Sequence, residues 1–199
     1  MADVYKFKVS LKGMEKHIWR DIEITSVSSV AKLGYAVLAS VEANANHLFY
    51  IEYDGVRYEF PTDDIMVEGT LTDPSKVKLA SLYLKEGSQL KMEYDYGASW
   101  MFDIELISIT ELGRGVGNHY PYVTNGAGKG IVEELSLGDL LEVIERTDKT
   151  GELPLYYDYN LEKKMPWDYR EFDLKYLNTF FKDNIASIAD TYECLDCGD

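Results

Sequence analysis

The amino-acid sequence predicts an α+β fold, with a mostly antiparallel sheet built from hairpins and with helices covering one face. Two observations lead to this class. Apolar and polar residues alternate along several paired segments, and three other segments carry apolar residues at helical spacing. The 16 Tyr residues and the aromatic content of 13% also favour strands. A length of 199 residues suits a single domain over residues 1–199, with residues 192–199 expected as a C-terminal tail.

The clearest hairpin spans residues 91–106. Apolar side chains occupy every second position of both arms, and a glycine lies in the gap between them. These positions are Met92, Tyr94, Tyr96, Trp100, Phe102, Ile104 and Leu106. Because Trp100 shares this parity, it is expected to be buried. If Tyr96 stands opposite Trp100, then Glu93 stands opposite Asp103 on the other face, where like charges repel unless they are solvated or hold a cation.

Two further hairpins are expected. Residues Val4–Leu11 and Ile18–Ile24 alternate on either side of a short break, and Trp19 falls on the partly exposed face of the second strand. Residues His47–Tyr53 and Arg57–Phe60 flank an Asp-Gly pair, which is a strong signal for a two-residue hairpin turn. We expect the first of these hairpins to share one core with the aromatic hairpin described above.

Three segments have the periodicity of amphipathic helices. The first runs from Val30 to about Val41 behind two serines, the second follows Ser136, and the third begins at Asp173; each start carries a residue that favours the N-cap position. The apolar stripe of the third helix consists of Leu174, Leu177, Phe180 and Phe181.

Three stretches have no clear period. Residues 77–84 suit either a strand or a short helix, and residues 156–167 are aromatic and irregular. Residues 113–130 hold six of the fifteen glycines, so we expect a long surface loop there. Loops of this length are often functional.

Composition limits the partners and the location. The formal net charge is −15 and the pI is about 4.6, with no run of three basic residues, so we expect no direct nucleic-acid binding. We expect no membrane association, because no apolar run approaches the roughly 20 residues of a spanning helix. Cys194 and Cys197 lie in the expected tail and are interpreted as reduced surface thiols, which indicates a cytoplasmic protein.

Several residues are candidates for a site. Tyr94, Asp95, Trp100 and His47 are the candidate binding residues, and His119 and Glu133 are weak candidates for catalysis. A hydrogen-bonded, buried role is favoured for His47 over catalysis, whereas His119 lies beside a Tyr-Pro pair in the glycine-rich stretch, where it could serve as a general base. We expect neither a metal nor another cofactor.

Two classes of function fit these residues. The favoured one is a non-enzymatic binding or interaction module with an unknown protein or small-molecule partner. The alternative is a metal-assisted hydrolase that uses the acidic face of the 91–106 hairpin. Its ligands would be Glu93, Asp95 and Asp103, with Glu133 from the glycine-rich segment, because hard cations prefer carboxylate oxygens.

Four sequence blocks resemble the Ri-plasmid ORF-three-like family, whose members are also described as insertion-element passenger TnpR-like proteins. The blocks are Val9-Ser-Leu-Lys-Gly followed by Ile18-Trp19-Arg20, Asn46-His47-Leu48 before Tyr50, Tyr94-Asp95-Tyr96-Gly97 with Trp100, and Tyr120-Pro121 followed by Phe172-Asp173-Leu174 and Asn178. The resemblance implies a mobile-element association and a divergent member. Polar residues of the family motifs fall here on Phe49, Ala98, Ser99, Met101 and Phe102. The TnpR-like label implies a resolvase, yet the chain has no basic helix-turn-helix.

Overall fold

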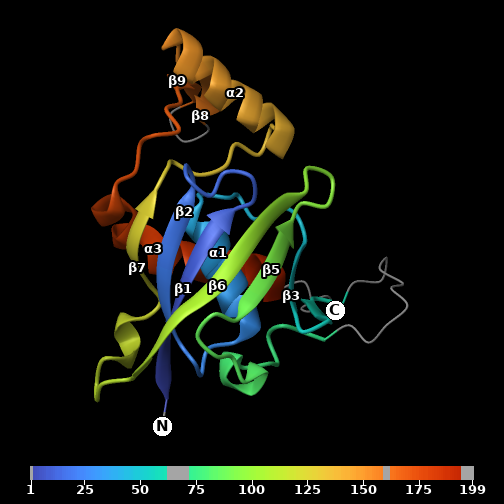
Figure 1. Cartoon of the computed structure of the whole chain (residues 1–199), viewed down its shortest axis with the longest axis vertical. Coiled ribbons are helices and arrows are strands. Elements are labelled where there is room, and N and C mark those ends of the chain that lie inside the picture. The colour runs from blue at the N-terminus through green and yellow to red at the C-terminus, as the bar shows by residue number, and fades with distance from the viewer. Residues whose placement is uncertain (1, 62–71, 159–161, 194–199) are drawn as a thin grey trace.

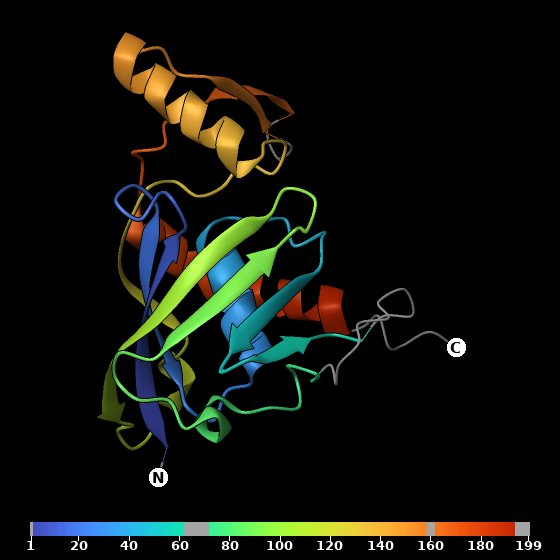
Figure 2. The same cartoon turned by 45° about the vertical axis from the view of Figure 1, so that its right-hand side comes forward.

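The computed structural model describes residues 2–61, 72–158 and 162–193. Its main sheet has seven strands in the order β4-β3-β5-β6-β1-β2-β7, and every neighbouring pair is antiparallel. The strands are β1 (Asp3–Leu11), β2 (Trp19–Thr25), β3 (Phe49–Tyr53), β4 (Val56–Glu59), β5 (Gln89–Tyr94), β6 (Trp100–Glu111) and β7 (Tyr122–Ala127). Helices α1 (Val30–Ser40) and α3 (Leu174–Glu193) cover one face (Figures 1 and 2). The predicted α+β class is confirmed.

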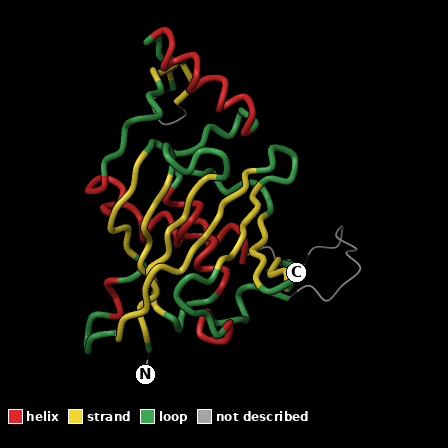
Figure 3. The backbone as a smooth tube through the Cα atoms, in the orientation of Figure 1, coloured by secondary structure: helices red, strands yellow, loops and turns green. Residues whose placement is uncertain are grey.

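The three predicted hairpins form one continuous sheet (Figure 3). β1 pairs with β2 on one side and with β6 on the other, so the first hairpin and the aromatic hairpin share a core as expected. Asp54 and Gly55 both have positive φ between β3 and β4, as a two-residue turn requires. Trp100 is 0% exposed and Trp19 is half-buried, which confirms both expectations.

The register expected for the 91–106 hairpin is wrong. Tyr94, not Tyr96, stands opposite Trp100, and Glu93 therefore faces Met101. The cause is a wide turn organised by Asp95, whose Oδ1 accepts hydrogen bonds from the backbone N–H groups of Gly97 (3.0 Å) and Ala98 (3.3 Å). This turn removes Tyr96 from the strand and places Lys91, not Glu93, opposite Asp103.

Two expectations about irregular stretches are corrected. The glycine-rich stretch contains β7, which pairs with β2 at the sheet edge, so it is only partly a loop. The 156–167 stretch holds most of a further hairpin outside the main sheet, β8 (Leu155–Asp158) with β9 (Lys163–Pro166). Residues 77–84 contain a short 3-10 helix at Leu79–Leu82, the second of the two expected forms. Cys194 and Cys197 lie outside the described residues.

Helix α3 crosses the face of the sheet from β7, where Asn178 contacts Val123, to the loop before β3, where the Tyr192 hydroxyl donates to the His47 carbonyl (Figure 2). Its buried stripe is Leu177, Phe181, Ile185, Ile188 and Tyr192. Tyr192, which the sequence assigned to the tail, is thus a buried part of the helix. Phe180, assigned to the stripe, is 46% exposed. The side chain of Asn178 covers the edge of β7: its Nδ2 donates to the Val123 carbonyl (2.8 Å) and its Oδ1 accepts from the Val123 N–H (3.0 Å).

Helix α2 (Leu137–Thr150) and the β8–β9 hairpin lie together at one end of the main sheet (Figure 1). Ser136 caps α2 as predicted, and Asp139 completes a capping box with it. Leu140 and Ile144 form the buried side of the helix. Across the described ranges, no helix is both long and apolar enough to cross a membrane.

Candidate functional site

A groove runs along the outer side of α3. It consists of two cavities, of about 370 and 560 Å³, which share Glu42, Tyr176 and Leu177 as walls. We call it the α3 groove. The remaining lining residues are Arg20, Ala39, Ser40, Ala43, Asn44, Lys129, Glu171, Phe172, Asp173, Phe180, Asn184, Ser187 and Ile188. Four segments that are distant in sequence therefore meet here: Arg20 of β2, the end of α1 with the residues that follow it, Lys129 after β7, and residues 171–188.

Two aromatic side chains stand on the rim of the α3 groove. Tyr176 is 63% exposed and Phe180 is 46% exposed. They are four residues apart on one helix and therefore lie on the same side, where their rings make an edge contact with centroids 5.3 Å apart. A pair of exposed aromatic rings beside a cavity can hold an apolar or cationic group by its face.

The floor of the groove is fixed by Arg20, which is 1% exposed. Its Nε donates to the Ser40 carbonyl (2.8 Å), and its Nη2 donates to the Gly128 carbonyl (2.7 Å). Its Nη1 donates to the carbonyls of Trp19 (2.9 Å) and Ala127 (2.5 Å). Burial lowers the pKa of the guanidinium to about 10, with the opposing charge of Glu42 as a smaller effect. Arg20 therefore remains charged at neutral pH and is committed to backbone contacts.

Two glycines allow the chain to come this close to Arg20. A Cβ on Gly126 would lie 2.7 Å from the Phe172 ring and 2.9 Å from the Arg20 side chain. Gly128 has a φ of +77°, and a Cβ there would lie 2.1 Å from the His17 carbonyl oxygen. The Phe172 ring in turn covers the guanidinium at 4.5 Å. The glycine-rich stretch thus serves the packing around Arg20.

Glu42 lies on the wall shared by both cavities, and it differs from Arg20 in how its charge is satisfied. Its φ of +59° lies in the left-handed region and ends helix α1, where the N–H groups of Glu42 and Ala43 donate to the carbonyls of Ala39 and Leu38. Within the described ranges its carboxylate forms no hydrogen bond and no ion pair. Desolvation raises the pKa of this carboxyl, and the nearby charges of Lys129 and Arg20 only partly oppose the shift. Glu42 is exposed and has no polar partner among the described residues, so its carboxylate is available to a ligand.

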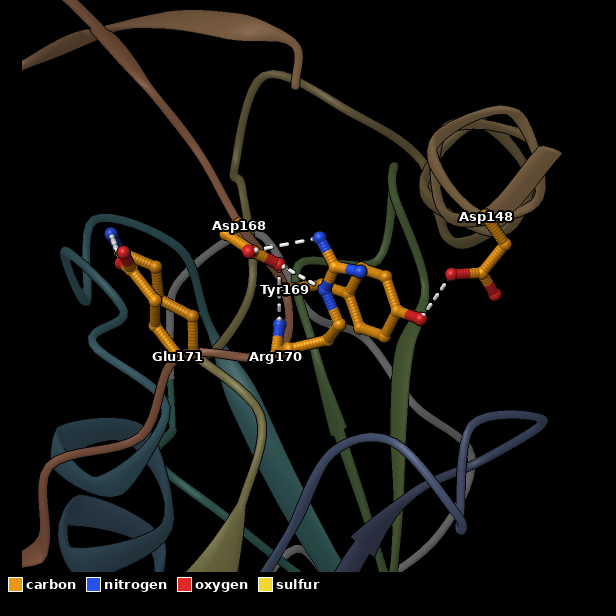
Figure 4. A network of polar contacts seen from close by, with 6 residues as sticks. Asp148, Asp168, Tyr169, Arg170 and Glu171 are labelled. Carbon is orange, nitrogen blue, oxygen red and sulfur yellow. Dashed lines mark hydrogen bonds and ion pairs between the residues drawn. The ribbon is translucent and has the colours of Figure 1, made fainter. Parts of the chain in front are cut away.

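The segment that carries one wall of the groove is held by a polar network (Figure 4). Lys129 Nζ pairs with Glu171 at 2.6 Å. Arg170 makes two contacts to the Asp168 carboxylate, of 2.7 and 3.0 Å. The Tyr169 hydroxyl donates to Asp148 of α2 at 2.5 Å. These contacts fix residues 168–171 between α2 and the groove.

Two of the candidate residues from the sequence are connected to the groove through Asn44, which lines it. The Tyr94 hydroxyl donates to Glu133 Oε1 at 2.8 Å, and the backbone N–H of Asn44 donates to the same oxygen at 2.7 Å. Burial, followed by the contact with Glu133, raises the pKa of Tyr94, so this hydroxyl remains a donor. Tyr94 and Glu133 thus position the loop that presents Glu42.

The other candidates are dispersed. The expectation that His47 is buried is wrong: its side chain is half-exposed, and its Nε2 lies 3.6 Å from Asp95 Oδ2, because β3 begins only at Phe49 and leaves His47 in the preceding loop. Trp100 lies in the core, and its Nε1 has no hydrogen-bond partner among the described residues. His119 is exposed and stacks on Tyr122 with ring centroids 4.7 Å apart.

The acidic face of the 91–106 hairpin does not converge on one point. Glu93 accepts hydrogen bonds from the hydroxyls of Tyr50 (2.7 Å) and Ser99 (2.8 Å). Asp103 stands between Lys91 and Ser10 on the neighbouring strands. Over the parts of the chain that are described, no group of three or more His, Cys, Asp or Glu side chains is arranged to hold a metal ion.

Sequence reasoning missed the residues that make the groove. Phe180 was assigned to the core and Tyr176 was not singled out. A signal for Arg20 was present, because it occupies an apolar position between Ile18 and Ile22. An arginine at such a position must be buried with its donors satisfied.

The fold and the groove define a class of protein. It is an α+β protein whose antiparallel sheet is covered on one face by α1 and α3, and α3 borders an open groove. The family model described as plasmid pRiA4b ORF-3-like protein matches residues 3–178, and the chain belongs to this family. Among solved structures, it is similar to a protein of unknown function from Methanosarcina mazei Go1, with 27% identity, a TM-score of 0.71, and coverage of 88% of this chain and 96% of that one. A comparison with curated proteins finds no match.

Proposed function

We propose that this protein is a non-enzymatic binding module that holds a basic segment of a protein partner in the α3 groove. The observation that carries this proposal is the exposed pair of Tyr176 and Phe180 beside the unpaired carboxylate of Glu42. Exposed aromatic residues next to a cavity are the usual anchors of a protein interface. The groove also suits a chain segment, because its two cavities adjoin each other at Glu42, Tyr176 and Leu177.

Charge selects a basic partner. The chain carries a formal charge of −15, which favours the approach of a cationic segment. Inside the groove, Arg20 is satisfied by carbonyls and Lys129 is paired with Glu171, so both cations are already engaged. Glu42 is left to accept a lysine or arginine, whose alkyl stem and charge would lie against the aromatic rim.

The backbone of Glu42 is fixed by the end of helix α1. Its positive φ closes the helix, where the N–H groups of Glu42 and Ala43 donate to the carbonyls of Ala39 and Leu38. Here Glu133 holds the adjacent Asn44 N–H and thereby fixes the loop. The site is thus prepared before the partner arrives, which lowers the ordering cost of binding.

The test is a selection from a random peptide library displayed on phage, with the wild-type chain as bait. We expect enrichment of peptides with Lys or Arg next to apolar residues. Their binding should be lost with the double variant Tyr176→Ala/Phe180→Ala and weakened about tenfold or more with Glu42→Gln, because a charge-assisted contact disappears. Tyr83→Ala is the matched control, since Tyr83 is 84% exposed and outside the groove.

Three outcomes would overturn the proposal: no enrichment, enrichment of acidic peptides, or binders that the groove variants hold equally well. Circular dichroism of the double variant checks that it is folded. Because both aromatic residues are exposed, we expect their removal to change the free energy of unfolding by less than about 0.5 kcal/mol each.

A thermal melt separates this proposal from the metal-assisted hydrolase that uses Glu93, Asp95 and Asp103. A metal bound to the native state raises the melting temperature. We expect no shift with millimolar Ca²⁺, Mg²⁺, Mn²⁺ or Zn²⁺. A shift that Asp103→Asn abolishes would favour the hydrolase instead.

A further inference from the structure

A second pocket lies on the opposite side of α3 from the groove. Its α3 wall is formed by Lys182, Ile185, Ala186, Ala189 and Glu193, which recur at helical spacing. The facing wall is formed by Ser29, Lys32 and Tyr35 at the start of α1 and by Tyr120 and Pro121 before β7. The cavity measures about 280 Å³. We call it the α1–α3 pocket.

The interior of the α1–α3 pocket is mainly apolar. Pro121, Ile185 and Ala189 supply aliphatic surface, and the buried ring of Tyr35 closes one side. The Tyr35 hydroxyl donates to Glu193 Oε1 at 3.1 Å, so the hydroxyl and this carboxylate are already engaged with each other. The volume lies just below the ~300–1,000 Å³ of pockets for drug-sized ligands, so the pocket suits a small organic molecule.

Two ammonium groups border this apolar interior. Lys182 Nζ donates to the backbone carbonyl of Asn118, which holds it beside the loop that forms the outer wall. Lys32 is half-buried, and across the described ranges its Nζ forms no hydrogen bond and no ion pair. Among the described lysines, Lys6, Lys76, Lys129 and Lys149 pair with carboxylates. Lys32 has no such partner, and it is distinguished by being half-buried at the border of an apolar cavity.

We propose that the α1–α3 pocket binds a small organic anion with an apolar body, of the class of aryl or short-chain alkyl carboxylates. The apolar walls take the body, and Lys32 and Lys182 hold the carboxylate at the rim. A charged group on an apolar body matches this arrangement, because a neutral molecule would leave Lys32 unpaired and an inorganic ion would leave the apolar walls unfilled. The site is separate from the α3 groove and does not depend on the function proposed for it.

The test is isothermal titration calorimetry of the full chain with phenylacetate and hexanoate, with phenylacetamide and inorganic phosphate as matched probes. We expect both carboxylates to bind and the amide and phosphate to bind at least tenfold more weakly. Lys32→Gln should weaken carboxylate binding about tenfold, because it removes a charge-assisted contact. Ala189→Leu should abolish binding by filling the cavity. Lys16→Gln is the control, since Lys16 is exposed in the β1–β2 turn.

Equal binding of the amide and the carboxylate, or full binding by Lys32→Gln, would overturn the proposal, and so would the absence of binding by either carboxylate. Ala189→Leu has its own folding check, because its melting temperature should stay within a few degrees of the wild type. The peptide binding assigned to the α3 groove should be unchanged in both pocket variants, so the two proposals can fail independently.

Discussion

Arg20 at the floor of the α3 groove and Glu42 on its wall border the same cavity, but their charges are satisfied in different ways. Arg20 gives its donors to four backbone carbonyls and is covered by Phe172. Glu42 is exposed and has no polar partner among the described residues. A buried charge with every donor engaged is typical of a structural role, whereas an exposed charge without a partner is open to a ligand. We therefore call Arg20 and its contacts the frame of the groove, and we call Glu42, Tyr176 and Phe180 its working surface.

The largest effect should come from the frame. Arg20→Met keeps an apolar stem but leaves the carbonyls of Ser40, Ala127 and Gly128 without their donor. We expect a loss of about 3 kcal/mol in the free energy of unfolding, since each buried unpaired group costs about 1–3 kcal/mol. Urea denaturation followed by tryptophan fluorescence measures this. Arg170→Met is the control, because its ion pair with Asp168 is exposed and should cost less than about 1 kcal/mol. Equal losses in the two variants would refute the structural role of Arg20.

A smaller effect should come from the sheet edge next to the groove. Asn178→Leu removes both hydrogen bonds to the buried Val123 backbone and exposes the edge of β7. We expect a loss of about 1–2 kcal/mol in the free energy of unfolding. Asn184→Leu, on the exposed side of the same helix, should change it by less than about 0.5 kcal/mol. Hydrogen exchange of the Val123 amide should be faster in the first variant only, and unchanged protection there would contradict this assignment.

Glu42 should behave in the opposite way to Arg20. Because the pKa of Glu42 is raised in the folded state, the folded chain holds this proton more tightly than the unfolded chain, and ionisation of Glu42 lowers stability as the pH rises through the raised pKa. Glu42→Gln removes that cost. Because Glu42 is exposed, solvent screens this effect, and we expect the variant to be more stable than the wild type at pH 7 by less than about 0.5 kcal/mol.

The advantage of Glu42→Gln should disappear below about pH 4, where Glu42 is protonated in both states. Thermal melts of the two chains across this range measure the difference. Glu145→Gln, at an exposed pair with Lys149, controls for the change in net charge. A Glu42→Gln variant that is less stable than the wild type at pH 7 would show that the Glu42 carboxylate has a structural role.

The frame could largely be predicted from the sequence, because its signals are local. Period-two alternation predicted the strands from β1 to β6, and the Asp-Gly pair predicted the turn between β3 and β4. Ser136 predicted the start of α2. Strand β7 was not predicted, because glycines are typical of loops. These glycines are needed for packing against residues distant in sequence, as Gly126 packs against Phe172. The register near Trp100 was missed, because it depends on the hydrogen bonds of Asp95 within the turn.

The working surface could not be predicted, because distant segments assemble it. Glu42 becomes notable only beside Lys129 and Tyr176, which the fold brings to it from far along the chain. Helical spacing places Phe180 next to the buried stripe of α3, but spacing alone cannot tell which flank of a stripe is covered. Tyr94 and Glu133 were named as candidates, yet their role behind the Glu42 loop follows only from the contact to Asn44.

The smallest effect concerns duplex DNA, to which we expect no significant binding. Clustered free cations are the footprint of a DNA-binding surface, whereas the cations here are dispersed along an acidic chain and several are engaged: Arg57 pairs with Glu59, Lys6 with Asp21, and Arg20 with carbonyls. The exposed pair of Lys163 and Lys164 is too short to displace many counterions. Non-specific affinity should therefore be weaker than the ~10⁻⁴ to 10⁻⁶ M of DNA-binding proteins at physiological salt. Fluorescence anisotropy with a labelled duplex measures this, and micromolar binding that weakens steeply with salt would revive the resolvase interpretation.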